Sequence, residues 1–319
     1  MKDYTYFPGC SAEATAIGLG LSIQAISKPL DIELIELEDW TCCGSTPYGS
    51  LDKPESIAVA ARNLALAEKT GLDLVTPCSS CFVTLHGANL ELKRNPQLMG
   101  QVNEALAVVN LEYHGDVRVR HLTEVLVNDI TPEVIASRVQ WGLNGLKVAP
   151  YYGCQSVRPD YGFDDPESPQ SLDRLVDCLG AEAVPYPLKN RCCGGSLILS
   201  EETLALGLIR KLLDNAVDNG AQCITSPCPL CQTNLDAYQS RVNSRFQNDF
   251  NLPILFITQL IGLTLRIDPI SLGLNRNIVS PNEVLKHVYK VKDSVPLGVY
   301  GHIALPDKVL KYIRMVKRG

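Results

Sequence analysis

The sequence lacks the features that would place a chain in a membrane, on nucleic acid or outside the cell. Its most apolar run, Leu252 to Leu265, has 14 residues, whereas a membrane-spanning helix needs about 20. The net charge of -6 argues against nucleic acid as a partner, because phosphate binding requires a basic surface. Residues 1–6 do not show the basic and then apolar pattern of a signal peptide. We therefore expect a cytoplasmic protein whose thiols are reduced.

Long polar tracts are absent too, and the composition, with 20% charged and 45% hydrophobic residues, is that of a folded protein. The 319 residues exceed the size at which one core usually divides, which favours two domains. Residues 281–319 differ from the rest, because they carry eight Lys or Arg and three acidic residues. Within them, residues 307–318 form a basic amphipathic pattern. This pattern is typical of a terminal helix docked on the protein, and the alternative is peripheral contact with the cytoplasmic membrane face.

Cysteine is what the sequence has in abundance, and ten of the twelve cysteines form one pattern that occurs twice. Each copy has a leading cysteine, an adjacent pair and a Cys-x-x-Cys motif, with 34 residues between the pair and the motif. The first copy consists of Cys10, Cys42, Cys43, Cys78 and Cys81, and the second of Cys154, Cys192, Cys193, Cys228 and Cys231. We infer an internal duplication, with domains at residues 1–145 and 146–280 and a tail at 281–319.

Both halves alternate strand-like and helical segments, which predicts an α/β fold with a mostly parallel sheet in each half. The expected strands are 4–8, 32–37, 72–76, 147–151, 183–186, 223–226 and 254–257. The expected helices are 12–27, 55–69, 171–179 and 201–219, with others starting near 78, 229 and 258. Each cysteine element follows a predicted strand, and the carboxyl ends of parallel strands carry the ligand. We therefore expect the five cysteines of each half to meet at one sheet edge.

The cysteine spacing indicates a metal centre of more than one ion. A Cys-x-x-Cys turn presents both sulfurs to one centre, as in zinc and iron-sulfur sites. Adjacent cysteines suit a multinuclear cluster better, because their sulfurs must diverge to different metals or one must bridge them. Five thiolates also exceed the four of a Cys₄ zinc site or an ordinary cubane. Iron-sulfur in at least one half is the favoured interpretation, and zinc in one or both halves stays open; a disulfide framework is disfavoured in a large chain without an export signal.

The other candidate residues have simpler interpretations. Cys178 and Cys223 fall outside the repeat, and we expect both to be free structural cysteines. The five histidines show no paired metal-ligand spacing. His86 follows the first Cys-x-x-Cys motif on its predicted helix, and we interpret it as structural. The glycines after the adjacent cysteines, at 44, 194 and 195, would let the backbone approach a cluster closely.

With both sets of five complete, the sequence resembles the CCG-domain, or cysteine-rich-domain, family, and within it the HdrB subunit of heterodisulfide reductase. The similarity runs from Tyr6 to about Gly273. It implies two pseudo-symmetric Rossmann-like CCG domains, followed by a helical C-terminal tail. It also implies that each set of five cysteines holds a noncubane [4Fe-4S] cluster in which one thiolate bridges irons.

The same resemblance implies an oxidoreductase subunit that reduces a disulfide held between the two clusters, each of which gives one electron. The chain has no ferredoxin-type cysteine run, so electrons would come from a ferredoxin-like iron-sulfur subunit, with a flavoprotein subunit expected in the same complex. Related CCG proteins act as the third subunit of succinate dehydrogenase-type complexes and pass electrons to quinone. This second role stays open, and no residue identifies which disulfide would be the substrate.

Overall fold

The computed structural model describes residues 1–45, 49, 51–157 and 163–290. The predicted amphipathic segment 307–318 lies outside the described residues. Within the described ranges, no helix combines the length and the apolar character needed to cross a membrane.

The first half contains a four-stranded parallel sheet in the order β2-β1-β3-β4. Its strands are β1 Lys2–Tyr6, β2 Ile32–Glu36, β3 Leu74–Thr76 and β4 Val119–His121. The central strand β3 is buried along its whole length, as expected for a parallel strand that is covered on both faces. Three of these strands match the predicted ones within two residues at each end, and β4 was not among the predictions.

The second half repeats this sheet with the equivalent order β6-β5-β7-β8. Its strands are β5 Lys147–Pro150, β6 Glu182–Ala183, β7 Cys223–Ser226 and β8 Ile254–Phe256. In each half the first strand lies between the second and the third, and the fourth lies at the edge. The prediction of an α/β fold with two similar, parallel-sheet halves is confirmed. The division at residues 145 and 280 stays a prediction, although the two sheets separate between β4 and β5.

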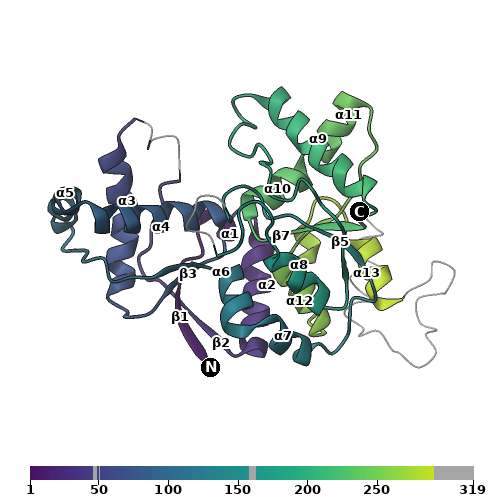
Figure 1. Ribbon diagram of the computed structural model, residues 1–319, viewed down its shortest axis with the longest axis horizontal. Helices are drawn as coiled ribbons and strands as arrows, with labels where there is room; N and C mark the ends of the chain where they lie inside the picture. The colour runs from purple at the N-terminus through teal and green to yellow at the C-terminus, as the bar shows by residue number, and fades with distance from the viewer. Residues whose placement is uncertain (46–48, 50, 158–162, 291–319) are drawn as a thin grey trace.

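The helices connect the strands in step in the two halves (Figure 1). Those of the first half are α1 Cys10–Glu13, α2 Ile17–Ser27, η1 Lys28–Leu30, α3 Lys53–Glu68, α4 Ser79–Arg94, α5 Pro96–Ala107, α6 Leu122–Glu124, the π-helix η3 Val125–Ile130 and α7 Pro132–Arg138. Those of the second half are α8 Ser171–Cys178, α9 Glu202–Asp218, α10 Pro229–Ala237, α11 Gln239–Phe246, α12 Ile257–Thr264, η4 Leu274–Arg276 and α13 Asn282–Tyr289.

The first predicted helix, 12–27, differs from the structure because it is broken in two. Ala14 leaves the helical region at φ −124° and ψ −88°, and Ala16 does so at φ −121° and ψ 41°. The N–H of Ala16 donates to the carbonyl oxygen of Ser11 at 2.7 Å, which closes the turn between α1 and α2. The break allows α1 to begin at Cys10 while α2 lies on the sheet.

Each half has its own apolar core on its outer side. In the first half, Leu64 of α3, Leu85 of α4 and Val102 of α5 are buried together. In the second half, Ile209 of α9 and Leu235 of α10 belong to the equivalent core. Figure 1 shows α3 and α5 at one end of the molecule and α9 at the other, away from the boundary between the halves.

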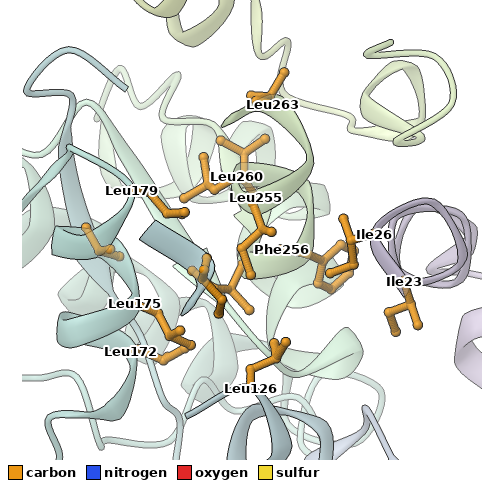
Figure 2. Close-up of a cluster of buried hydrophobic side chains, with 14 of the residues drawn as sticks. Ile23, Ile26, Leu126, Leu172, Leu175, Leu179, Leu255, Phe256, Leu260 and Leu263 are labelled. Carbon is orange, nitrogen blue, oxygen red and sulfur yellow. The ribbon is translucent and has the colours of Figure 1, made fainter. Parts of the chain in front are cut away.

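A third core lies between the halves and joins them. Figure 2 shows side chains of α2, η3, β8, α8 and α12 meeting there. The labelled members are Ile23, Ile26, Leu126, Leu172, Leu175, Leu179, Leu255, Phe256, Leu260 and Leu263. Helix α2 of the first half packs on α12 of the second, and α8 of the second packs on α6 and α7 of the first. The two halves therefore exchange equivalent contacts, as in a symmetric dimer within one chain.

Polar contacts and close backbone approach hold the same boundary. The hydroxyl groups of Ser22 on α2 and Thr258 on α12 lie 2.6 Å apart. A Cβ added to Gly273 would lie 2.6 Å from the Cα of Gly18, so the two backbones touch. In the described part of the predicted tail, one face of α13 packs into the shared core, and the indole N–H of Trp141 donates to the carbonyl oxygen of Val288 at 2.8 Å.

Candidate metal centre

The three cysteine elements of the first half lie at the carboxyl ends of three strands. After β1 the chain turns at Gly9, and α1 begins at Cys10. The pair Cys42 and Cys43 lies in the loop after β2. After β3, Cys78 is the N-cap residue of α4, and Cys81 lies in the first turn of that helix. The sheet topology therefore brings the three elements to one edge, as the sequence predicted.

The five sulfurs of the first half form a series of contacts. The thiol of Cys42 contacts those of Cys10 and Cys43. Cys43 in turn contacts Cys81, and Cys81 contacts Cys78. Residues from three separate stretches of sequence are thus connected through sulfur.

The second half repeats this series in the same order. Cys192 contacts Cys154 and Cys193. The sulfurs of Cys193 and Cys231 lie 3.7 Å apart, and Cys231 contacts Cys228. Cys228 is the N-cap residue of α10, in the position that Cys78 occupies on α4.

The two series meet across the boundary between the halves. The thiols of Cys78 and Cys228 are both buried and lie close enough to shift each other's pKa, upward for Cys78 and downward for Cys228. Beside them, the Ser80 hydroxyl donates to the side-chain oxygen of Gln155 at 2.5 Å, which links the start of α4 to the residue after Cys154. All ten cysteines of the repeat therefore belong to one continuous site.

Backbone N–H groups of both halves donate to these sulfurs. The N–H of Gly194 lies 3.3 Å from the sulfur of Cys192, and Gly44 makes the equivalent bond to Cys42. Such donors and the N-terminus of α10 favour thiolate, and the pKa of Cys228 at that N-terminus is lowered, first by its hydrogen bond with Cys231. The pKa of Cys42 is nevertheless raised by burial, and that of Cys78 by its hydrogen bond with Cys228. Hydrogen bonding from Cys154 lowers the pKa of Cys192 well below its ordinary value.

Two buried amides hold the loops with the adjacent cysteines. The side-chain oxygen of Asn63 on α3 accepts from the N–H of Thr41 at 2.8 Å. The side-chain NH₂ group of Asn234 on α10 donates to the carbonyl oxygen of Cys193 at 2.7 Å. Both side chains are buried, so each loop is anchored to a helix of its own half.

The donor set fits a thiolate-bound inorganic centre. Each half offers five soft sulfur donors at one edge, and thiolates select iron-sulfur clusters, zinc or copper(I). Among the described residues, no group of three or more Cys, His, Asp or Glu is disposed around a single ion. Cys10, Cys42 and Cys192 are exposed, whereas both Cys-x-x-Cys motifs are buried. The donors thus line a site that is open on one side.

A histidine that the sequence did not single out lies beside the place where the two series approach each other. His121 ends β4 and is fully buried, and its Nε2 lies 3.4 Å from the hydroxyl of Ser79, the residue after Cys78. Burial lowers the pKa of His121 to about 4, so the ring is neutral. No spacing rule could have found it, because β4 reaches Cys78 only through the pairing of Thr76 with His121.

The remaining cysteines and His86 lie outside the series of sulfur contacts described above. Cys223 is buried at the opposite end of β7 from Cys228, and the half-buried Cys178 donates its S–H to the carbonyl oxygen of Leu175. Cys223 belongs to the core between the halves, and Cys178 packs against that core. His86 packs against Phe82 and lies within hydrogen-bond distance of the Val119 carbonyl oxygen, which is a structural environment.

Comparisons with known proteins agree with this geometry. The family model of the CCG cysteine-rich domain matches the chain twice, at residues 4–86 and 148–236. The 8-methylmenaquinol:fumarate reductase membrane anchor subunit of Wolinella succinogenes is 37% identical over 285 residues, covering 89% of this chain and 99% of that protein. The HdrB subunit of the Ferredoxin/F(420)H(2)-dependent CoB-CoM heterodisulfide reductase of Methanosarcina acetivorans is 32% identical over 296 residues, covering 91% of this chain and 98% of that protein.

The chain belongs to the CCG cysteine-rich-domain family and carries two copies of that domain. The resemblance to the HdrB subunit of heterodisulfide reductase is confirmed by several relatives of that name, which are subunits of oxidoreductases. A hypothetical protein from Helicobacter pylori of known crystal structure has the same fold, with a TM-score of 0.70 and 16% identity. That match covers 88% of this chain and 52% of the other, so this chain spans about half of it.

Proposed function

We propose that this chain is the disulfide-reducing subunit of a heterodisulfide reductase-type complex, with a noncubane [4Fe-4S] cluster in each half. The observation that carries this proposal is the contact of two complete five-cysteine sets at Cys78 and Cys228. The proposed ligands are Cys10, Cys42, Cys43, Cys78 and Cys81 for the first cluster, and Cys154, Cys192, Cys193, Cys228 and Cys231 for the second.

The chemistry requires two electron sources at one place. Reduction of a disulfide consumes two electrons, and an iron-sulfur cluster ordinarily supplies one. The protein's part is to hold the two sites together: the shared core fixes the halves, and the two N-cap cysteines bring the sites into contact. The exposed side chains of Cys10, Cys42 and Cys192 mark the side from which a substrate would approach.

The chain would receive its electrons from other subunits. We propose a ferredoxin-like iron-sulfur subunit as the direct donor and a flavoprotein subunit in the same complex. The name of the Methanosarcina acetivorans relative, which belongs to a ferredoxin- or F(420)H(2)-dependent reductase, supports this arrangement. We propose a cytoplasmic location. Residues 307–318 would either dock on the protein itself or, as the alternative, make peripheral contact with the cytoplasmic membrane face.

A second candidate function is electron exchange with a quinone in a succinate dehydrogenase- or fumarate reductase-type complex. The 37% identity to the Wolinella succinogenes membrane anchor subunit over nearly the whole of that protein favours it. A quinone, like a disulfide, takes up two electrons, so the same paired sites would serve. The substrate therefore distinguishes the two functions, rather than the metal centre.

Two measurements test the proposal. Anaerobically reconstituted protein should contain about eight iron and about eight sulfide per chain, the content of two [4Fe-4S] clusters. Zinc in place of iron in both halves would refute a redox role. Dye-reduced protein should then transfer electrons to low-molecular-weight disulfides. Turnover with a menaquinone analogue and none with any disulfide would select the second function.

A further inference from the structure

We propose that Ser79 of the first half donates a hydrogen bond to the Cys228 sulfur of the second half, and that His121 holds the serine hydroxyl in position for it. The second cluster would then be reduced more easily than the first. This inference rests on the proposed function, because it requires a redox cluster on Cys228.

Three buried groups from different elements form this contact. Ser79 is the first residue of α4, and its side chain lies near Cys228, the N-cap residue of α10, whose thiol pKa it helps to lower. The same hydroxyl lies 3.4 Å from Nε2 of His121 at the end of β4. Ser79 is 1% exposed and His121 is 0% exposed, so water does not compete for either group.

The hydrogen-bond direction follows from the histidine ring. Its Nδ1 accepts from the backbone N–H of Thr123 at 3.1 Å. A neutral imidazole that accepts at Nδ1 carries its proton on Nε2. Nε2 therefore donates, to the Ser79 oxygen and to the Pro77 carbonyl oxygen beside it. The serine hydrogen remains available for the sulfur of Cys228.

The second half does not return this contact. The residue after Cys228 is Pro229, which has no hydroxyl, where the first half has Ser79. The strand pairing places Phe256 beside Ser226, where the first half places His121 beside Thr76. The second half therefore lacks both the hydroxyl donor, because Pro229 replaces Ser79, and the residue that positions it, because Phe256 replaces His121. Cys78 receives no hydroxyl from the position equivalent to Ser79.

A hydrogen bond to a ligand sulfur stabilises the more negative, reduced state of a cluster and raises its reduction potential. The cluster of the second half should therefore hold an electron before that of the first. In the proposed reaction the two electrons would be stored in a fixed order, although the ligand sets are the same. Ser79 and His121 are positioning residues in this scheme, since neither is a ligand.

Single-cluster backgrounds make the test specific. The Cys43→Ser protein should retain only the second cluster. In this background, Ser79→Ala should lower the reduction potential of that cluster, which a redox titration monitored by electron paramagnetic resonance measures. Loss of one hydrogen bond to a charged sulfur should lower the reduced-to-oxidised ratio roughly tenfold at fixed potential, a shift of about 59 mV for one electron. In Cys193→Ser protein, which should retain the first cluster, the same substitution should leave the potential unchanged.

Further variants keep the test decisive. Ser79→Pro copies Pro229 and suits the first position of a helix, so it replaces Ser79→Ala should that variant fold poorly. His121→Phe copies Phe256 and should shift the second potential in the same direction. Ser137→Ala, which removes a hydroxyl on the distant α7, is the matched control. An unchanged second potential with full iron content, or an equal shift of both potentials, would overturn the inference; absence of iron would instead refute the proposed function.

Discussion

Gly9 and Gly153 occupy the same position in the two halves. A Cβ added to either glycine would lie 2.9 Å from the sulfur of the second cysteine in the Cys-x-x-Cys motif of its own half. Gly9 faces Cys81 and has a φ of 75° and a ψ of 151°, and Gly153 faces Cys231 with a φ of 69°. Side chains are excluded at both positions by the sulfur and by the backbone conformation. The close approach lets the leading cysteine of each set reach the other four.

Gly9→Ala should therefore disrupt the first site and spare the second. We expect a loss of about 1–3 kcal/mol in the free energy of unfolding, because the Gly9 conformation is almost restricted to glycine. Iron content should fall by about half. Gly153→Ala should have the mirrored effect, and Gly207→Ala on α9, where an added Cβ meets nothing within 4 Å, should retain all iron. Full iron content in both variants would contradict this account.

Replacement of single cysteines should remove one cluster at a time. Cys43→Ser and Cys193→Ser each delete a sulfur from the middle of one series of contacts. We expect each variant to retain about half of the iron and to lose one of two paramagnetic signals. Cys178→Ser, outside both sets, should retain both signals. Two intact signals in Cys43→Ser would show that this residue is not a ligand.

The core between the halves should make the chain unfold as one unit. Leu260→Ala on α12 should lower the free energy of unfolding by about 3 kcal/mol, because it opens a cavity among fully buried side chains. In a Trp141→Phe background, Trp40 is the only tryptophan and reports on the first half. Its urea transition should shift with Leu260→Ala, a change in the second half, and should not shift with the exposed Val217→Ala. Independence of the Trp40 transition from Leu260 would disprove the shared core.

Asp236 should make stability fall as the pH rises from about 4 to about 6. Burial raises the pKa of this carboxyl from 3.8 to about 6, although it accepts from the backbone N–H groups of Ile278 and Val279. Between these two pKa values the folded state binds more protons than the unfolded state. Protonated Asp236 therefore contributes its full stabilisation below the unfolded-state pKa of 3.8, and this contribution is lost as the pH rises through the folded-state pKa of about 6. Asp236→Asn should flatten this slope in urea titrations, and Asp218→Asn on the surface should not.

The strands and the cysteine edge were predictable because their signals are local. Cys223–Ser226 is a strand as predicted, and Ile32–Glu36 differs from its prediction by one residue. Apolar runs bounded by turn residues define such strands, and the cysteines follow them directly. The meeting of each set at one edge then follows from parallel topology alone.

The parts that the sequence did not reveal depend on tertiary contacts. The break between α1 and α2 falls within an alanine-rich stretch with no helix-stopping residue, and a single bond from Ala16 to Ser11 marks it. Strand β4 is too short for a pattern, so the position of His121 became visible only through pairing with β3. The contact of Cys78 with Cys228 requires the relative placement of two domains, which no local spacing encodes.

The reciprocal packing of α2 on α12 and of α8 on α6 and α7 bears on how this protein arose. A solitary copy of either half would leave that apolar face in water, at a large free-energy cost. Two identical copies of one half would cover such matching faces by pairing as a homodimer with twofold symmetry. Within one chain the two copies can differ in sequence, and Ser79 stands where the second half has Pro229.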